Sequence, residues 1–197
     1  MIRGLMPAAL VVLAHVLPVA SWAAEDKVNP YAMPLCSIII SEMTEGKIGP
    51  DRAHEISRAI AQAGNKHFGR VTCGDMWLYM AIIHVESNFR NNLVNYHNCR
   101  GMFQVHAPSW ARKFGLKYAD LLDLETNADC GIRVFKYYLD LYKLLVPALS
   151  AYNSDHPRAA VGYASAVLNT RKKIKKRYTQ LYKKLEASKT VAANPAM

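Results

Sequence analysis

The sequence predicts a single, mainly α-helical domain. Its 197 residues are enough for one domain with a sizeable core. Several segments place apolar residues three and four positions apart, which is the spacing of one face of a helix. No stretch shows the apolar-polar alternation of a half-buried strand, and no internal repeat is visible. We therefore expect helices throughout the domain.

The first two expected helices flank a glycine. An amphipathic helix is predicted from about Pro50 to Ala63, and Gly64 ends it. A second helix is predicted from Asp75, which serves as its cap, to about Ser87. This second helix is apolar on nearly all sides, so it should lie at the centre of the fold.

The second half of the chain predicts a loop followed by further helices. The polar run 91–101 is a loop, and a short helix begins at Pro108 and stops at Gly115. A capping-box pattern at 126–129 opens a longer helix. The apolar stripe of that helix comprises Ile132, Phe135, Tyr138, Leu139 and Tyr142.

Two more helices and a tail complete the prediction. Pro147 starts one helix, and the last helix runs from about Pro157 into a basic segment. Residues 187–197 are expected to be a disordered tail.

The N-terminus has the pattern of a signal peptide over residues 1–23. Arg3 precedes an apolar stretch, and Ser21-Trp22-Ala23 has the small-x-small pattern of a cleavage site. An uncleaved anchor is the weaker alternative, because a span needs about 20 apolar residues and His15 interrupts this stretch. The expected location is the periplasm or cell-wall space.

The four cysteines all follow the expected cleavage point. An even number in an exported chain is best explained by two disulfide bonds. Three pairings are open, and we favour Cys36 with Cys73 and Cys99 with Cys130, because the second bond would tie the loop after Glu86 to the following helix. A zinc site is disfavoured because no Cys-x-x-Cys pair occurs.

Charge suggests an anionic partner. The formal net charge is +10, and loss of Arg3 with the leader leaves +9. Eight basic residues and no acidic ones lie in the segment Arg171–Lys184. This segment is either a solvated helix face or a contact for an anionic wall or membrane surface. No nucleic acid partner is expected for an exported chain.

Glu86 is the strongest candidate for catalysis. It ends an apolar helix, and no Asp or Glu occurs between Ser87 and Ala119. Burial and the C-terminal helix dipole both favour its protonated form, whereas the nearby charges of Arg90 and Arg100 favour the carboxylate. A carboxyl group with a raised pKa can protonate the oxygen of a glycosidic bond. Most glycosidases add a second carboxylate, and the nearest in sequence here is Asp120.

Other chemistries fit the sequence less well. His84, His97 and His106 lie near Glu86 in sequence, but the His-Glu-x-x-His spacing of a metal site is absent. We expect no metal and no cofactor.

Four ordered motifs resemble a known family. They are Glu86-Ser87-Asn88-Phe89, Gly101-Met102-Phe103-Gln104, the Asn127, Gly131 and Tyr138-Leu139 helix, and Ala151-Tyr152-Asn153. Between about Asp75 and Leu168, the chain resembles the soluble lytic transglycosylases, which share a lysozyme-like fold. The resemblance implies a single lysozyme-like domain over residues 24–186.

The resemblance also implies a reaction and its residues. Glu86 would protonate the bond between N-acetylmuramic acid (MurNAc) and N-acetylglucosamine (GlcNAc) in peptidoglycan, and then act as a base. The C6 hydroxyl would attack C1 and give a 1,6-anhydro sugar. Substrate-binding roles are implied for Gln104, Tyr152, Ser87, Phe103 and Asn95. Ser87 is also expected to hold the site through hydrogen bonds to backbone or loop groups, and core packing is the alternative for Phe103.

The sequence departs from the family in one loop and leaves alternatives open. The family usually has Ser at the position of Asn95 and a Gly-Ala pair at Asn98-Cys99. A hydrolytic lysozyme on the same fold and a noncatalytic wall-binding or assembly protein are the alternatives. The small size favours local wall opening, for which a wall-spanning secretion or conjugation machine is a candidate partner.

Overall fold

The helices predicted from apolar spacing are present and pack around a central one. The computed structural model describes residues 32–193, with side chains through Ser188. The elements of the N-terminal half are α2 (Ala32–Met43), α3 (Pro50–Phe68), α4 (Cys73–Ser87), β1 (Cys99–Arg100) and β2 (Val105–His106). The elements that follow are α5 (Ala107–Trp110), η2 (Arg112–Phe114), η3 (Tyr118–Leu122), α6 (Leu124–Tyr142), α7 (Leu145–Ser154) and α8 (Val161–Ala193).

Helix α4 is the central helix, as its apolar sequence predicts. Consecutive residues from Met76 to Ile83 are all buried, and α4 packs against α8, α2 and α3. The cap differs from the prediction. Thr72 is the N-cap, and Asp75 lies at the third helical position, where its carboxylate accepts from the Thr72 backbone N–H at 2.9 Å. This reciprocal capping box fixes where α4 begins.

Helix α3 continues to Phe68 and does not end at Gly64. A Cβ added at Gly64 would meet Val71 Cγ2 at 2.2 Å and Tyr79 Cε2 at 3.3 Å. The glycine therefore allows close packing inside the helix and does not terminate it. Gly69, with φ of 79°, follows the helix end.

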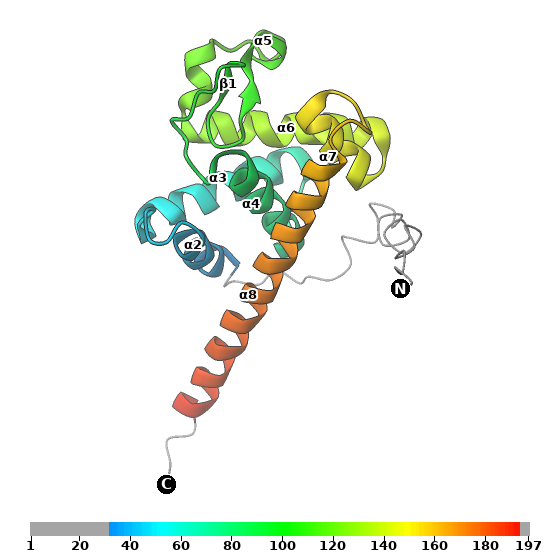
Figure 1. Ribbon diagram of the computed structural model, residues 1–197. Coiled ribbons are helices and arrows are strands. Elements are labelled where there is room, and N and C mark those ends of the chain that lie inside the picture. Colours follow the sequence, from blue (N-terminus) through cyan, green and yellow to red (C-terminus); the bar gives the residue numbers. More distant parts are fainter. Residues whose placement is uncertain (1–31, 194–197) are drawn as a thin grey trace, which may run out of the picture.

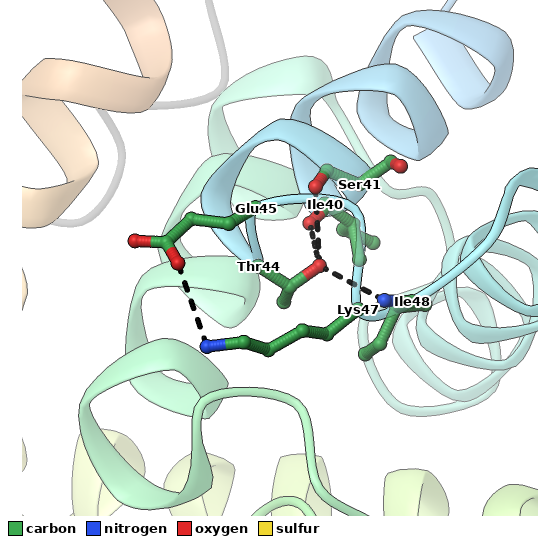
Figure 2. Close-up of polar contacts among 6 residues, drawn as sticks. All are labelled: Ile40, Ser41, Thr44, Glu45, Lys47 and Ile48. Carbon is green, nitrogen blue, oxygen red and sulfur yellow. Dashed lines mark hydrogen bonds and ion pairs between the residues drawn. The ribbon is translucent and has the colours of Figure 1, made fainter.

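Helix α2 was not predicted, and the turn after it is held by one buried threonine. Thr44 Oγ1 lies 2.9 Å from the Ile40 carbonyl oxygen and accepts from the Ile48 backbone N–H at 3.3 Å (Figure 2). The same turn places Lys47 Nζ 3.4 Å from the Glu45 carboxylate. These contacts close α2 and direct the chain back along α3.

Helix α6 begins one turn before the predicted capping box. Asp123 is its N-cap and accepts from the Thr126 backbone N–H at 2.9 Å. Asn127, which the prediction placed at the helix start, is instead fully buried inside α6. Four of the five predicted stripe residues are buried, Tyr142 is half-buried, and α6 packs against α3 and α7.

Helix α8 is longer than predicted at its C-terminal end. It begins at Val161, after a turn in which Ser150 Oγ accepts from the Ala160 backbone N–H at 2.9 Å. It then continues to Ala193, so the disordered tail expected from Ala187 is helical over 187–193. Its orange-to-red half extends away from the other helices (Figure 1).

The expected disulfide bonds are not present in the described part of the chain. Cys36 and Cys130 are buried in the core, and burial raises the pKa of each thiol to about 12. Cys73 Sγ lies 3.4 Å from the Tyr178 hydroxyl. These cysteines pack as small apolar side chains, and a thiol with a raised pKa supplies little thiolate for disulfide chemistry.

No helix within residues 32–193 is long and apolar enough to cross a membrane. The predicted signal peptide, residues 1–23, lies outside the described residues.

Candidate functional site

A cleft of about 370 Å³ opens beside the C-terminal end of α4. Glu86 comes from α4, Gln104 from the turn between β1 and β2, Trp110 from α5, and Tyr152 and Asp155 from the end of α7. Segments far apart in sequence therefore meet around one carboxyl group. This cleft is therefore the candidate active site.

Glu86 is held by a tyrosine that the sequence analysis did not select. The Tyr163 hydroxyl, on the first turn of α8, donates to Glu86 Oε1 at 2.6 Å. Burial raises the pKa of Glu86 to about 7, and the bond from Tyr163 acts in the opposite direction. Arg90 and Arg100, the expected opposing charges, are not among the causes. Near neutral pH, Glu86 therefore exchanges a proton readily.

The chain turns sharply after α4, which leaves Glu86 at the edge of the cleft. Asn88 and Phe89 both have positive φ, 51° and 64°. Asn88 caps the helix through its N–H to the His84 carbonyl, and the Phe89 ring is buried. This turn directs the following loop around the cleft.

Two predicted substrate-binding residues lie below the cleft surface. Ser87 is buried, and its hydroxyl donates to the Met102 carbonyl at 2.7 Å, which ties α4 to the hairpin turn. Phe103 is completely buried and packs on Gly131, where an added Cβ would meet its Cγ at 2.2 Å. Burial corrects the expectation that these side chains contact sugar, because both support the site from beneath.

The other three predicted residues do line the cleft. Gln104 Nε2 donates to the Gly101 carbonyl at 2.8 Å, which fixes its amide. Tyr152 donates to the Phe103 carbonyl at 2.8 Å, and burial together with the Glu86 carboxylate holds the pKa of Tyr152 well above its usual range. Asn95 lines the loop side of the cleft.

Asn127 connects α6 to the hairpin. Its Oδ1 accepts from the Phe103 backbone N–H at 2.9 Å, and its Nδ2 donates to the carbonyls of Arg100 and Leu121 at 2.9 and 2.8 Å. Gly101, with φ of 72°, leaves room for this amide. The buried asparagine thereby positions the Gly101–Gln104 turn beneath the cleft.

A second carboxylate does enter the cleft, and it is not the one nearest in sequence. Asp155 caps α7 with φ of 57° and accepts a hydrogen bond from the Tyr138 hydroxyl. Asp120 instead lies in the first turn of η3, where its carboxylate accepts from the backbone N–H of the N-cap residue Lys117 at 2.8 Å. The position just after the Ala151-Tyr152-Asn153 motif is the sequence signal that could have identified Asp155.

The basic segment Arg171–Lys184 is partly engaged within the fold. Arg177 forms two bonds to the Glu42 carboxylate, at 2.7 and 2.5 Å, and Arg171 donates to the Gly74 carbonyl at 3.2 Å. Lys175 lies over the Trp77 ring, 5.6 Å from its centroid. The exposed lysines of the segment are Lys172, Lys173, Lys175, Lys176, Lys183 and Lys184.

No group of three His, Cys, Asp or Glu residues between 32 and 193 is arranged to hold a metal ion. His106, one of the histidines near Glu86 in sequence, instead contacts Ser109 Oγ at 2.7 Å.

Fold and site together define a helical domain with a cleft in which the pKa of the Glu86 carboxyl group is raised. Residues 74–186 match the family described as Transglycosylase SLT domain. This match covers more than half of the chain, so the chain belongs to the SLT transglycosylase family. The family predicted from four motifs is confirmed, and the match extends beyond the predicted 75–168.

Membership of this family implies lytic transglycosylase-type activity on the glycan strands of peptidoglycan. Neither the curated proteins nor the solved structures include a significant match to this chain.

Proposed function

We propose that this chain is an exported lytic transglycosylase that cleaves the β-1,4 bond between MurNAc and GlcNAc. The observation that carries the proposal is the state of Glu86, whose pKa is raised to about 7 by burial while Tyr163 holds one of its oxygens. A group with a pKa near the working pH serves both as acid and as base.

In the first step, the Glu86 carboxyl gives its proton to the glycosidic oxygen. The bond from this oxygen to C1 of MurNAc breaks, GlcNAc leaves with a free 4-hydroxyl, and positive charge develops at C1. The Tyr163 hydroxyl, 2.6 Å from Glu86 Oε1, stabilises the carboxylate that this step produces. Tyr163 is therefore a positioning residue for the acid.

In the second step, the C6 hydroxyl of MurNAc attacks C1. The new C1–O6 bond closes the 1,6-anhydro ring, and the hydroxyl proton passes to the Glu86 carboxylate, which restores the acid. No water is consumed. One carboxyl group therefore suffices for both proton transfers.

The test of this assignment is Glu86→Gln. The amide keeps the volume and can still accept from Tyr163, but it has no proton to transfer, so lysis of purified sacculi should be lost. Glu45→Gln is the matched control, because Glu45 is an exposed carboxylate in the turn after α2. Substantial lysis by folded Glu86→Gln would exclude Glu86 as the acid.

Hydrolysis is the second candidate, and Asp155 is the observation that favours it. An inverting glycosidase uses a second carboxylate to activate water, and Asp155 lines the same cleft as Glu86. Against this role, the Tyr138 hydroxyl already donates to the Asp155 carboxylate. Product analysis separates the two reactions: anhydro ends are expected for wild type and for Asp155→Asn, whereas reducing ends that disappear in Asp155→Asn would indicate hydrolysis.

The noncatalytic alternative is a wall-binding or assembly protein with a drifted site. The raised pKa of Glu86 and its hydrogen bond from Tyr163 argue against it, and an absence of sacculus turbidity loss with wild-type protein would favour it.

Export and local wall opening are part of the proposal. The leader pattern at 1–23 supports periplasmic delivery, and the exposed lysines of the basic segment support contact with an anionic wall or membrane surface. Replacing Lys172, Lys173 and Lys176 by Gln should flatten the salt dependence of sacculus binding, because these charges are exposed to screening. If the salt dependence of sacculus binding were unchanged in this variant, the segment would be a solvated helix face without a binding role. A wall-spanning secretion or conjugation machine is the proposed setting.

A further inference from the structure

Tyr96 is the most exposed of the large apolar or aromatic side chains between Ala32 and Ser188. Its side chain is 92% exposed, whereas Leu141, which comes next, is 55% exposed. A single exposed aromatic residue is common on protein surfaces. What distinguishes Tyr96 is the structure of its loop and its place beside the cleft.

The loop holds the backbone at Tyr96 in an ordered turn. The Asn98 backbone N–H donates to the Asn95 carbonyl at 3.0 Å, which closes a turn with Tyr96 at its tip. Asn95 Oδ1 accepts from the backbone N–H groups of His97 and Cys99 at 2.9 and 3.0 Å. An asparagine that bonds the backbone two residues on stiffens a turn, so Tyr96 is held on an ordered support.

The neighbours of Tyr96 belong to the wall of the cleft. Asn95, His97 and Cys99 line the same cavity as Glu86. The ring centroids of Tyr96 and His97 are 3.9 Å apart, with their planes tilted by 41°. At this spacing the Tyr96 ring stacks on the His97 ring with its outer face exposed, and we call this pair of rings the aromatic platform. It extends the cleft wall outward at the loop side.

We propose that the aromatic platform binds a sugar ring of the glycan strand, beyond the two sugars that flank the cleaved bond. This inference rests on the proposed function. A glycan strand is longer than a cavity of about 370 Å³ can enclose, so it must leave across an edge. The platform lies at such an edge, because His97 lines the same cavity as Glu86 and Tyr96 stacks on His97 from outside the lining.

The surface of a sugar ring is chemically complementary to the aromatic platform. A pyranose ring presents C–H groups on its faces and hydroxyl groups at its rim. An aromatic ring is negative on its face, so it attracts C–H groups, while the Tyr96 hydroxyl remains in water. Tyrosine also gives a large contact area with few rotatable bonds to immobilise. The predicted ligand class is therefore an N-acetylhexosamine unit of a strand that extends past the cleft.

The test measures binding without turnover. In the full-length Glu86→Gln protein, the affinity for GlcNAc oligosaccharides of two to six units is measured by calorimetry. Adding Tyr96→Ala should weaken binding of the longest oligosaccharides roughly tenfold, the scale of one aromatic contact. It should leave the shortest oligosaccharide, which reaches only the sugars beside Glu86, within about twofold. Tyr96→Phe keeps the ring and should match the parent.

The controls separate the platform from the loop fold. Tyr118→Ala removes another exposed tyrosine, 42% exposed and outside the cleft lining, and should not affect any oligosaccharide. Equal affinity of Tyr96→Ala for every length, or an equal loss at every length, would overturn the proposal. If wild type lyses sacculi while Tyr96→Ala binds normally, only the platform fails; if wild type produces no cleavage, the proposed function fails.

Discussion

The burial of Glu86 predicts that Glu86→Gln stabilises the protein at alkaline pH. The folded state raises the pKa of Glu86 from an ordinary 4.5 to about 7. One pKa unit corresponds to about 1.4 kcal/mol, so ionising Glu86 destabilises the fold by about 3 kcal/mol. The folded state binds this proton more tightly than the unfolded state. Stability contributed by Glu86 is thus fully present below about pH 4.5 and is lost as pH rises through about 7.

Glutamine does not ionise, so the variant does not lose folding stability as the pH rises. Relative to wild type, the free energy of unfolding of Glu86→Gln should rise by about 3 kcal/mol between pH 4 and pH 8. Urea unfolding followed by circular dichroism measures it, with Glu45→Gln as the exposed control. Parallel pH dependence of wild type and Glu86→Gln over this range would refute a buried acid with a raised pKa.

Three further predictions concern the residues around the acid. Tyr163→Phe removes a bond that favours the carboxylate, so the alkaline limb of the pH–lysis profile should move up by about one pH unit. Asn127→Ala should lower the free energy of unfolding in urea by roughly 2–4 kcal/mol, because the buried Phe103 N–H loses its acceptor. Gly131→Ala should lower it by roughly 1–3 kcal/mol, since the new Cβ would overlap the Phe103 ring.

The site residues that can be predicted from sequence are those whose signal lies in a short stretch of neighbouring residues. Glu86 was identified because an apolar helix ends in a lone carboxylate, and the family match supplied Gln104 and Tyr152. Tyr163 was missed because it lies 77 residues from Glu86 along the chain, and only the packing of α8 on α4 brings them together. Asp155 was missed because the search for a second carboxylate compared distances from Glu86 along the chain, and Asp155 comes close to Glu86 only in space.

The elements that sequence missed are short or depend on tertiary context. Strands β1 and β2 have two residues each, too few to show alternation. Gly64 looked like a helix end but permits the close approach of Val71 to α3. The even number of cysteines suggested disulfide bonds, but Cys36, Cys73 and Cys130 are buried in the core, where a thiol contributes to packing without forming a disulfide.

The length of α8 has a geometric consequence for the whole molecule. Tyr163, which holds the acid, is in the first turn of this helix, and the helix ends at Ala193. At 1.5 Å per residue, these two points are about 45 Å apart. Because a continuous helix is stiff, it fixes the distance between these two points, whereas a flexible linker would only limit it. Anything docked at its far end would hold the cleft at a constant height above that attachment.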